Sequence, residues 1–394
     1  MAIAFILLFP VATFADEFEI LVVPSLMDAD MDAWYRIPSN SGPLIHNAPD
    51  VSVGQPFNLL VFFRGYATDA KNQAHVTYDV QVYGPDGKPT DDNGHGIVAY
   101  QGSVTNKEYI LLNQQFLKII FTEKYPLGTY KIKVTAYDKV GNQTAAGEKS
   151  LPLKAFSSGV EFASEEMFSE WLMHYHERPE PCRAVKAITQ FVSLDTEWLT
   201  GYVGILAFFR RVLVENEFLT DNLLTNFKGF SVEEQKKLLM VLHLAGYDKT
   251  AALAKAYPQL EKFYPTLRTL QIPATDGDIT TGDQLDILWS EFLATGKYAP
   301  VKKIVETLAL YKFKGTLEKI TSGENKEKTD QVIRESFLDA TYQAAAWSLV
   351  SNCRQIPLVF KYCVTIYEKE PLDDAIKQQL RAVLAVAQKD GSKK

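Results

Sequence analysis

Residues 125–144 read YPLGTYKIKVTAYDKVGNQT, and this stretch decides how the first half of the chain is interpreted. From residue 129 onward, polar and apolar side chains alternate one by one, which is typical of a β-strand with one buried face. The buried face would carry Tyr130, Ile132, Val134 and Ala136, and the solvent face Lys131, Lys133, Thr135 and Tyr137. Pro126 and Gly128 favour a turn before the strand, and Asp138 with Gly141 favours one after it. The stretch therefore predicts a structural strand rather than the rim of a site.

Seven other segments in the first half share this pattern of β-branched and aromatic residues punctuated by turn residues. They are residues 18–23, 56–66, 75–84, 97–102, 108–112, 116–121 and 148–154. Short strands without intervening helices indicate an antiparallel sandwich or barrel. The run DDNGHG at residues 91–96, which contains His95, is interpreted as a hairpin tip.

The run PLGTYKIKV at residues 126–134 resembles the corner and penultimate strand of immunoglobulin-like and macroglobulin-like domains. The resemblance covers about residues 18–154 and implies that the Tyr130 hydroxyl bonds back to the preceding loop. Ile132 stands where antibody domains have their second cysteine, and Trp34 falls in a long segment that is expected to be irregular rather than on a central strand. A fibronectin-like or bacterial relative is therefore favoured over an antibody-type domain.

After a hinge at residues 157–159, the apolar residues recur with the spacing of a helix. Residues 283–296 and 299–311 each carry an apolar stripe, Ser231 and Glu234 have capping-box spacing, and further helices are expected over 332–352, 357–370 and 373–388. Helical hairpins around Gly246 and Gly296 are similar to those of tetratricopeptide-like proteins. The expected fold class is multidomain all-β plus all-α: an Ig-like sandwich at residues 16–155 and an α-solenoid-like domain of antiparallel hairpins at 160–394.

Residues 1–15 form an apolar run that ends in small residues before Asp16, which predicts a signal peptide; a buried first strand is the alternative. The protein is then expected to be periplasmic or secreted, with no transmembrane segment after the signal is removed.

The net charge of −7 and the absence of a long basic run argue against nucleic acid as a partner.

Three aspartates, Asp28, Asp30 and Asp32, alternate as in a calcium loop, and calcium is the one metal or cofactor that the sequence suggests. Ala33 and Ser39 occupy the positions where that loop has glycine and glutamate.

The chain has three cysteines, of which Cys353 and Cys363 flank an expected helix–helix turn; spacing alone leaves their pairing open.

No nucleophile elbow, metalloprotease pair or phosphate-binding loop occurs in the sequence, which makes an enzyme less probable than a binding protein. The candidate binding residues are Trp34, Tyr35, Trp289 and Tyr298. The leading hypothesis is a non-catalytic adaptor of a bacterial envelope that binds another protein through its helical domain. The alternatives are a secreted hydrolase with carboxylates at the domain junction and a calcium-dependent adhesin.

Overall fold

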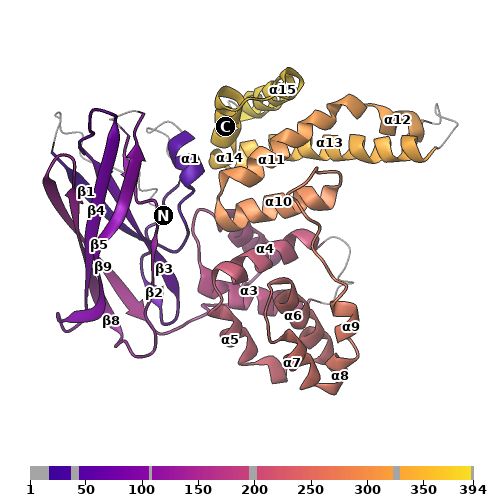
Figure 1. Cartoon of the computed structure of the whole chain (residues 1–394). Coiled ribbons are helices and arrows are strands. Elements are labelled where there is room, and N and C mark those ends of the chain that lie inside the picture. The colour runs from indigo at the N-terminus through magenta and orange to yellow at the C-terminus, as the bar shows by residue number, and fades with distance from the viewer. Residues whose placement is uncertain (1–16, 37–43, 106–108, 195–201, 323–328, 392–394) are drawn as a thin grey trace. The chain divides into compact units, whose positions relative to one another are not determined.

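The computed structural model describes residues 17–36, 44–105, 109–194, 202–322 and 329–391. The N-terminal half is rich in strands and the C-terminal half is helical, which confirms the change of period near residue 155. The chain forms two compact units (Figure 1). Among the described residues, the β unit holds 17–31 and 44–157, and the helical unit holds 32–36 and 158–391.

The β unit contains two sheets. In the first sheet, β3 (Pro56–Arg64) pairs antiparallel with β1 (Glu19–Ser25), β6 (Leu111–Leu112) and β7 (Leu117–Ile120). The second sheet has the order β2 (Val51–Ser52), β9 (Gln143–Lys154), β8 (Gly128–Asp138), β4 (Gln73–Tyr83) and β5 (Pro89–Ser103). All its pairs are antiparallel except β2 with β9.

Strand β8 has the alternation that the sequence predicts. Tyr130, Ile132, Val134 and Ala136 are completely buried, whereas Lys131 and Lys133 are exposed. The Tyr130 hydroxyl donates to the Pro126 carbonyl at 2.9 Å, which confirms the hydrogen bond expected for this corner. Because the ring is buried and the hydroxyl reaches the turn, Tyr130 fixes the turn against the sheet.

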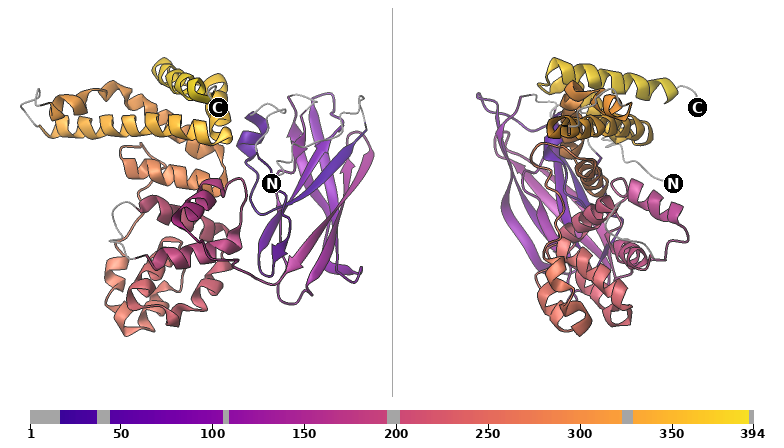
Figure 2. Two further views of the ribbon diagram at one scale, coloured as in Figure 1. Left: turned by 180° about the vertical axis from the view of Figure 1, so that it is seen from behind. Right: turned by 90° about the vertical axis from the view of Figure 1, so that its right-hand side faces the viewer.

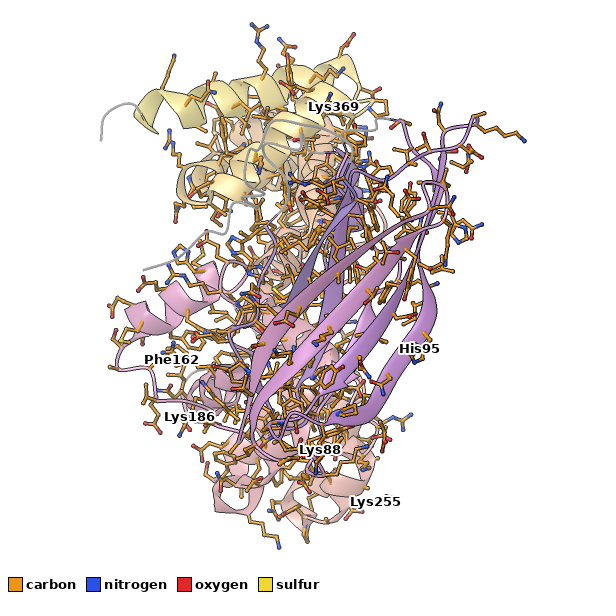
Figure 3. The ribbon with its side chains drawn as sticks, turned by 90° about the vertical axis from the view of Figure 1, so that its left-hand side faces the viewer. Lys88, His95, Phe162, Lys186, Lys255 and Lys369 are labelled. Carbon is orange, nitrogen blue, oxygen red and sulfur yellow. The ribbon has the colours of Figure 1, made fainter. Side chains whose placement is uncertain are left out.

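Residues 91–96 are not a hairpin tip, so that prediction was wrong. They lie inside β5, where Asn93 pairs with Gln81 and Gly94 pairs with Val80 of β4. The pairing contains register shifts, and a Cβ atom on Gly94 would lie 2.7 Å from Cδ1 of Ile97, so glycine avoids a clash there. His95 lies on this outermost strand, exposed at the edge of the sheet (Figure 3).

The helical unit consists of α-helices joined by short connecting segments. Its α-helices from residue 165 onward are α2 (Glu165–His174), α3 (Ala184–Val192), α4 (Val203–Glu215), α5 (Leu219–Leu224), α6 (Val232–Leu244), α7 (Thr250–Lys255), α8 (Pro258–Glu261), α9 (Tyr264–Leu267), α10 (Gly282–Thr295), α11 (Tyr298–Glu306), α12 (Thr316–Thr321), α13 (Asp330–Gln355), α14 (Pro357–Lys369) and α15 (Asp374–Gly391). None of the helices in the described part of the chain is long and apolar enough to cross a membrane.

Helix boundaries follow the signals in the sequence. Ser231 and Glu234 form the expected capping box at the start of α6. Gly296 ends α10 in the left-handed conformation, φ 66°, which glycine adopts without strain. Tyr362 of α14 donates to the Gly296 carbonyl at 2.8 Å, so the α10–α11 turn is bonded to α14.

One short helix, α1 (Met31–Arg36), follows β1 in sequence, and its residues from Asp32 onward belong to the helical unit. The segment around Trp34 is therefore helical rather than irregular, so that prediction was wrong. Ala33 is completely buried in the same apolar core as residues of α10, α11, α13, α14 and α15. Residues 32–36, which lie in sequence between the two ranges of the β unit, thus contribute to the core of the helical unit.

Candidate functional site

A buried carboxylate, Glu370, holds α1 in the helical unit. Glu370 directly follows α14 in sequence, and its side chain is 2% exposed. Arg36 Nη1 donates to Glu370 Oε1 at 2.5 Å, and Lys302 Nζ of α11 donates to Oε2 at 2.7 Å. The Tyr298 hydroxyl donates to Oε1 at 3.2 Å. One acid thus joins three segments of the chain.

The two cations decide the charge of this carboxylate. Burial raises the pKa of Glu370, but the Lys302 ammonium, with smaller contributions from Arg36 and Tyr298, outweighs burial and leaves the pKa below its ordinary value. Burial and the adjacent carboxylate raise the pKa of Tyr298, so its hydroxyl stays a donor. Since every partner of Glu370 is already engaged and the acid is enclosed, this cluster is suited to holding α1 rather than to chemistry on a ligand.

The candidate binding residues from the sequence belong to two parts of the helical unit. Trp34 and Tyr35 are half-buried on α1. Trp289 of α10 and Tyr298 of α11 belong to the core of the helical unit, 9% and 2% exposed. In this structure, the latter two therefore contribute to packing, and α1 contributes Ala33 to the same core.

The three candidate metal ligands occupy different settings. Asp28 Oδ1 accepts a hydrogen bond from Asn58 Nδ2 of β3 at 2.8 Å. Asp30 is half-buried beyond β1, and Asp32 is exposed on α1. Across the residues that the structure describes, no group of three or more His, Cys, Asp or Glu side chains is arranged to hold a metal ion.

None of the three cysteines, all of which lie in the described residues, forms a disulfide bond. Cys353 of α13 and Cys363 of α14 flank the turn between these helices, as the sequence predicted, and both are buried in the helical core. A hydrogen bond with Cys353 and burial raise the pKa of the Cys363 thiol, so it is poorly reactive. Cys182 is half-buried.

The longest helix in the described part of the chain is α13 (Figures 1 and 2). It carries apolar side chains on two faces. The inner face packs into the helical core through Tyr342, Ala345, Leu349 and Cys353. Asp339, also completely buried, accepts hydrogen bonds from the Gly315 and Leu317 amides at 2.9 and 3.0 Å. It thereby fixes the start of α12 against α13.

The outer face of α13 is the candidate functional site. It carries Ile333, Phe337, Ala340, Ala344 and Trp347, which we call the α13 seam. The Phe337 and Trp347 side chains are 66% and 73% exposed, far more than large aromatic side chains in a folded core. Two aromatic residues exposed on one helix face are typical of a surface that binds another protein.

The sequence pattern predicted this helix but not its seam. Apolar residues on two opposite faces leave no clear amphipathic stripe, so periodicity alone could not identify the outer face. A usable signal was present, however. The seam residues are spaced by four and three in alternation, the pattern of helices that pair with other helices.

No protein-family model and no curated protein matches this chain. Among solved structures, the chain is similar to a family 123 glycoside hydrolase from Clostridium perfringens, a protein described in connection with glycolipid glycan hydrolysis. The identity is 8%, the TM-score is 0.21, and the match covers 47% of this chain and 36% of that one. The chain thus spans little more than a third of this relative, and a likeness this weak supports no inference about fold or function.

Proposed function

We propose that this chain is a non-catalytic protein-binding protein, and that its helical unit makes the contact through the α13 seam. One observation carries the proposal: Phe337 and Trp347 expose most of their side chains on the same face of one helix. Exposed aromatic side chains of this size form the centres of protein interfaces, where they dominate the binding free energy. The partner surface would be another apolar helix, because the seam runs along one helix and has two alanines, Ala340 and Ala344, at its middle.

The architecture inferred from the sequence fits this role. We infer an immunoglobulin-like sandwich in the β unit, supported by its two sheets and by the Tyr130–Pro126 hydrogen bond. We infer tetratricopeptide-like hairpins in the helical unit, supported by the α10–α11 turn at Gly296. Both types of domain commonly present surfaces to other proteins.

We also infer that the protein is exported to a bacterial envelope. The support is the apolar run at residues 1–15, which lies outside the described residues. The mature protein would begin at or near Asp16, and N-terminal mass spectrometry of protein from its native cells checks this cleavage.

Photo-crosslinking in native cells tests the binding function. A photoreactive phenylalanine analogue is placed at position 347 in one variant and at position 232 in another. Val232 is the matched control because it is an exposed apolar residue, 41%, on α6 of the same helical unit. We expect a protein adduct at position 347 and little or none at 232.

Equal crosslinking at both positions, or none at position 347, would contradict the proposed function. The mass of the adduct identifies the partner, and it also separates a second copy of this chain from a different protein.

A further inference from the structure

We propose that the partner of the α13 seam is the α13 seam of a second copy of this chain, with the two helices running antiparallel. This inference rests on the proposed function, since it names the partner of the same surface. The seam itself specifies how two copies would pair, through its spacing, the sizes of its side chains and the charges at its ends.

The spacing fits a pair of helices. Phe337, Ala344 and Ser351 are seven residues apart and occupy one position of a heptad. Ile333, Ala340 and Trp347 occupy the second seam position, four residues before or three after. In an antiparallel pair, the first position of one helix lies opposite the second position of the other. The face opposite this seam, which includes Tyr342 and Leu349, is the one buried in the core.

One register matches the side chains by size. If Phe337 lies opposite the second copy's Trp347, then Ala340 lies opposite the second copy's Ala344. A two-fold axis that crosses the seam midway between Ala340 and Ala344 produces each pair twice, as a closed dimer requires. The alanines at the centre let the helices approach closely, and the aromatic pairs on both sides of them contact each other.

The same register pairs opposite charges at the ends of the seam. Asp330 then lies opposite the second copy's Arg354, and both residues are exposed. The antiparallel direction also places the positive end of each helix dipole beside the negative end of the other. Among the positions that flank the seam from Asp330 to Gln355, only Arg334 is charged, and it faces the second copy's Ser348. No like charges oppose each other in this arrangement.

The area is sufficient for a modest dimer. A buried aromatic side chain covers about 150–250 Å², and Phe337 and Trp347 expose about two-thirds to three-quarters of theirs. Two copies together would bury on the order of 600 Å² on these rings alone. With the rest of the helix face, the contact reaches about 1,000 Å², the lower end of specific interfaces. Dimerisation in the micromolar range is the expected result.

Sedimentation velocity of the full chain tests the dimer. We expect a concentration-dependent shift toward twice the mass of one chain. Trp347→Lys should weaken self-association at least about tenfold, and the exposed control Val232→Lys should leave it unchanged. Thermal melting of both variants checks that they fold. A chain that stays monomeric at about 200 µM, or a dimer that Trp347→Lys leaves intact, overturns the inference.

Crosslinking tests the register. Ala340→Cys and Ala344→Cys are placed in separate chains of different tag size, each also carrying Cys182→Ser, and the mixture is oxidised with diamide. The antiparallel register predicts a disulfide-linked dimer in the mixture and none with either variant alone. A dimer linked through Ala344→Cys alone would show the helices to be parallel and would contradict the register.

The two proposals can fail separately. If position 347 crosslinks to a different protein while the purified chain stays monomeric, the seam belongs to that partner, and only the dimer is refuted. If position 347 crosslinks to nothing and the chain is monomeric, both proposals fail.

Discussion

Arg36 and Glu370 form an ion pair at 2.5 Å although 334 residues separate them in sequence. The pair joins α1 to the C-terminal end of α14 inside the helical unit. Lys302 binds the other oxygen of the same carboxylate. Because the acid is buried and both cations are partly exposed, loss of the acid should affect stability more than loss of either cation.

Replacing the acid tests this relationship at neutral pH. Glu370→Gln keeps the shape of the side chain but removes the charge that Arg36 and Lys302 contact. We expect a loss of about 2 kcal/mol in the free energy of unfolding, measured with urea. The control is Glu368→Gln, an exposed glutamate of the same helix, which should change stability by less than about 0.5 kcal/mol. Equal effects would show that the Glu370 cluster does not hold α1.

The same cluster predicts a dependence on pH. The pKa of Glu370 is lower in the folded protein than in the unfolded chain, where it is about 4.3. Its stabilising contribution is therefore complete above the unfolded pKa and is lost as the pH falls through the folded pKa. The difference in stability between the wild type and Glu370→Gln should stay constant from pH 6 to 8 and shrink below about pH 4. A difference that grows on acidification would refute the assigned charge.

Asp339 provides a prediction about α12. Asp339→Ala leaves the Gly315 and Leu317 amides without their acceptor, so we expect a loss of about 2–3 kcal/mol. Asp339→Asn keeps one oxygen acceptor and should lose about 1 kcal/mol or less. Hydrogen exchange should be faster across Thr316–Thr321 in the alanine variant only. If the two variants are equally stable, the contact with α12 contributes little.

In the β unit, the corner tyrosine can be tested without disturbing the packing. Tyr130→Phe removes only the hydroxyl that donates to Pro126, and we expect a loss of about 1 kcal/mol. Tyr137 of the same strand bonds to Asp79 on the solvent face, so Tyr137→Phe should cost less than about 0.5 kcal/mol. The reverse order would contradict the structural role given to the corner.

Regular patterns in the sequence predicted the parts of the fold that local physics determines. The alternation around Tyr130 predicted the buried face of β8, and the capping residues Ser231 and Glu234 predicted the start of α6. Strand β5 was missed in part, because polar residues and Gly94 are typical of turns and only pairing with β4 extends the strand there.

Other features depend on contacts that no local pattern contains. Six residues are too few to show a helical period, and α1 is stabilised by Glu370, distant in sequence. Likewise, the sequence could not show that Trp289 is buried and Trp347 exposed, since both lie in helices with apolar faces and the difference arises from which helices pack beside them.

The central claim is that a protein covers the α13 seam in the cell, and the reactivity of a cysteine at its middle tests this most directly. Ala344→Cys and the control Ala382→Cys, an exposed alanine of α15, are compared in a Cys182→Ser background. Both should react with a maleimide at similar rates in dilute purified protein. In concentrated native extract, we predict that Ala344→Cys reacts at least about tenfold more slowly than Ala382→Cys. Equal rates for the two positions in that extract would mean that the seam is uncovered, and the proposed function would be wrong.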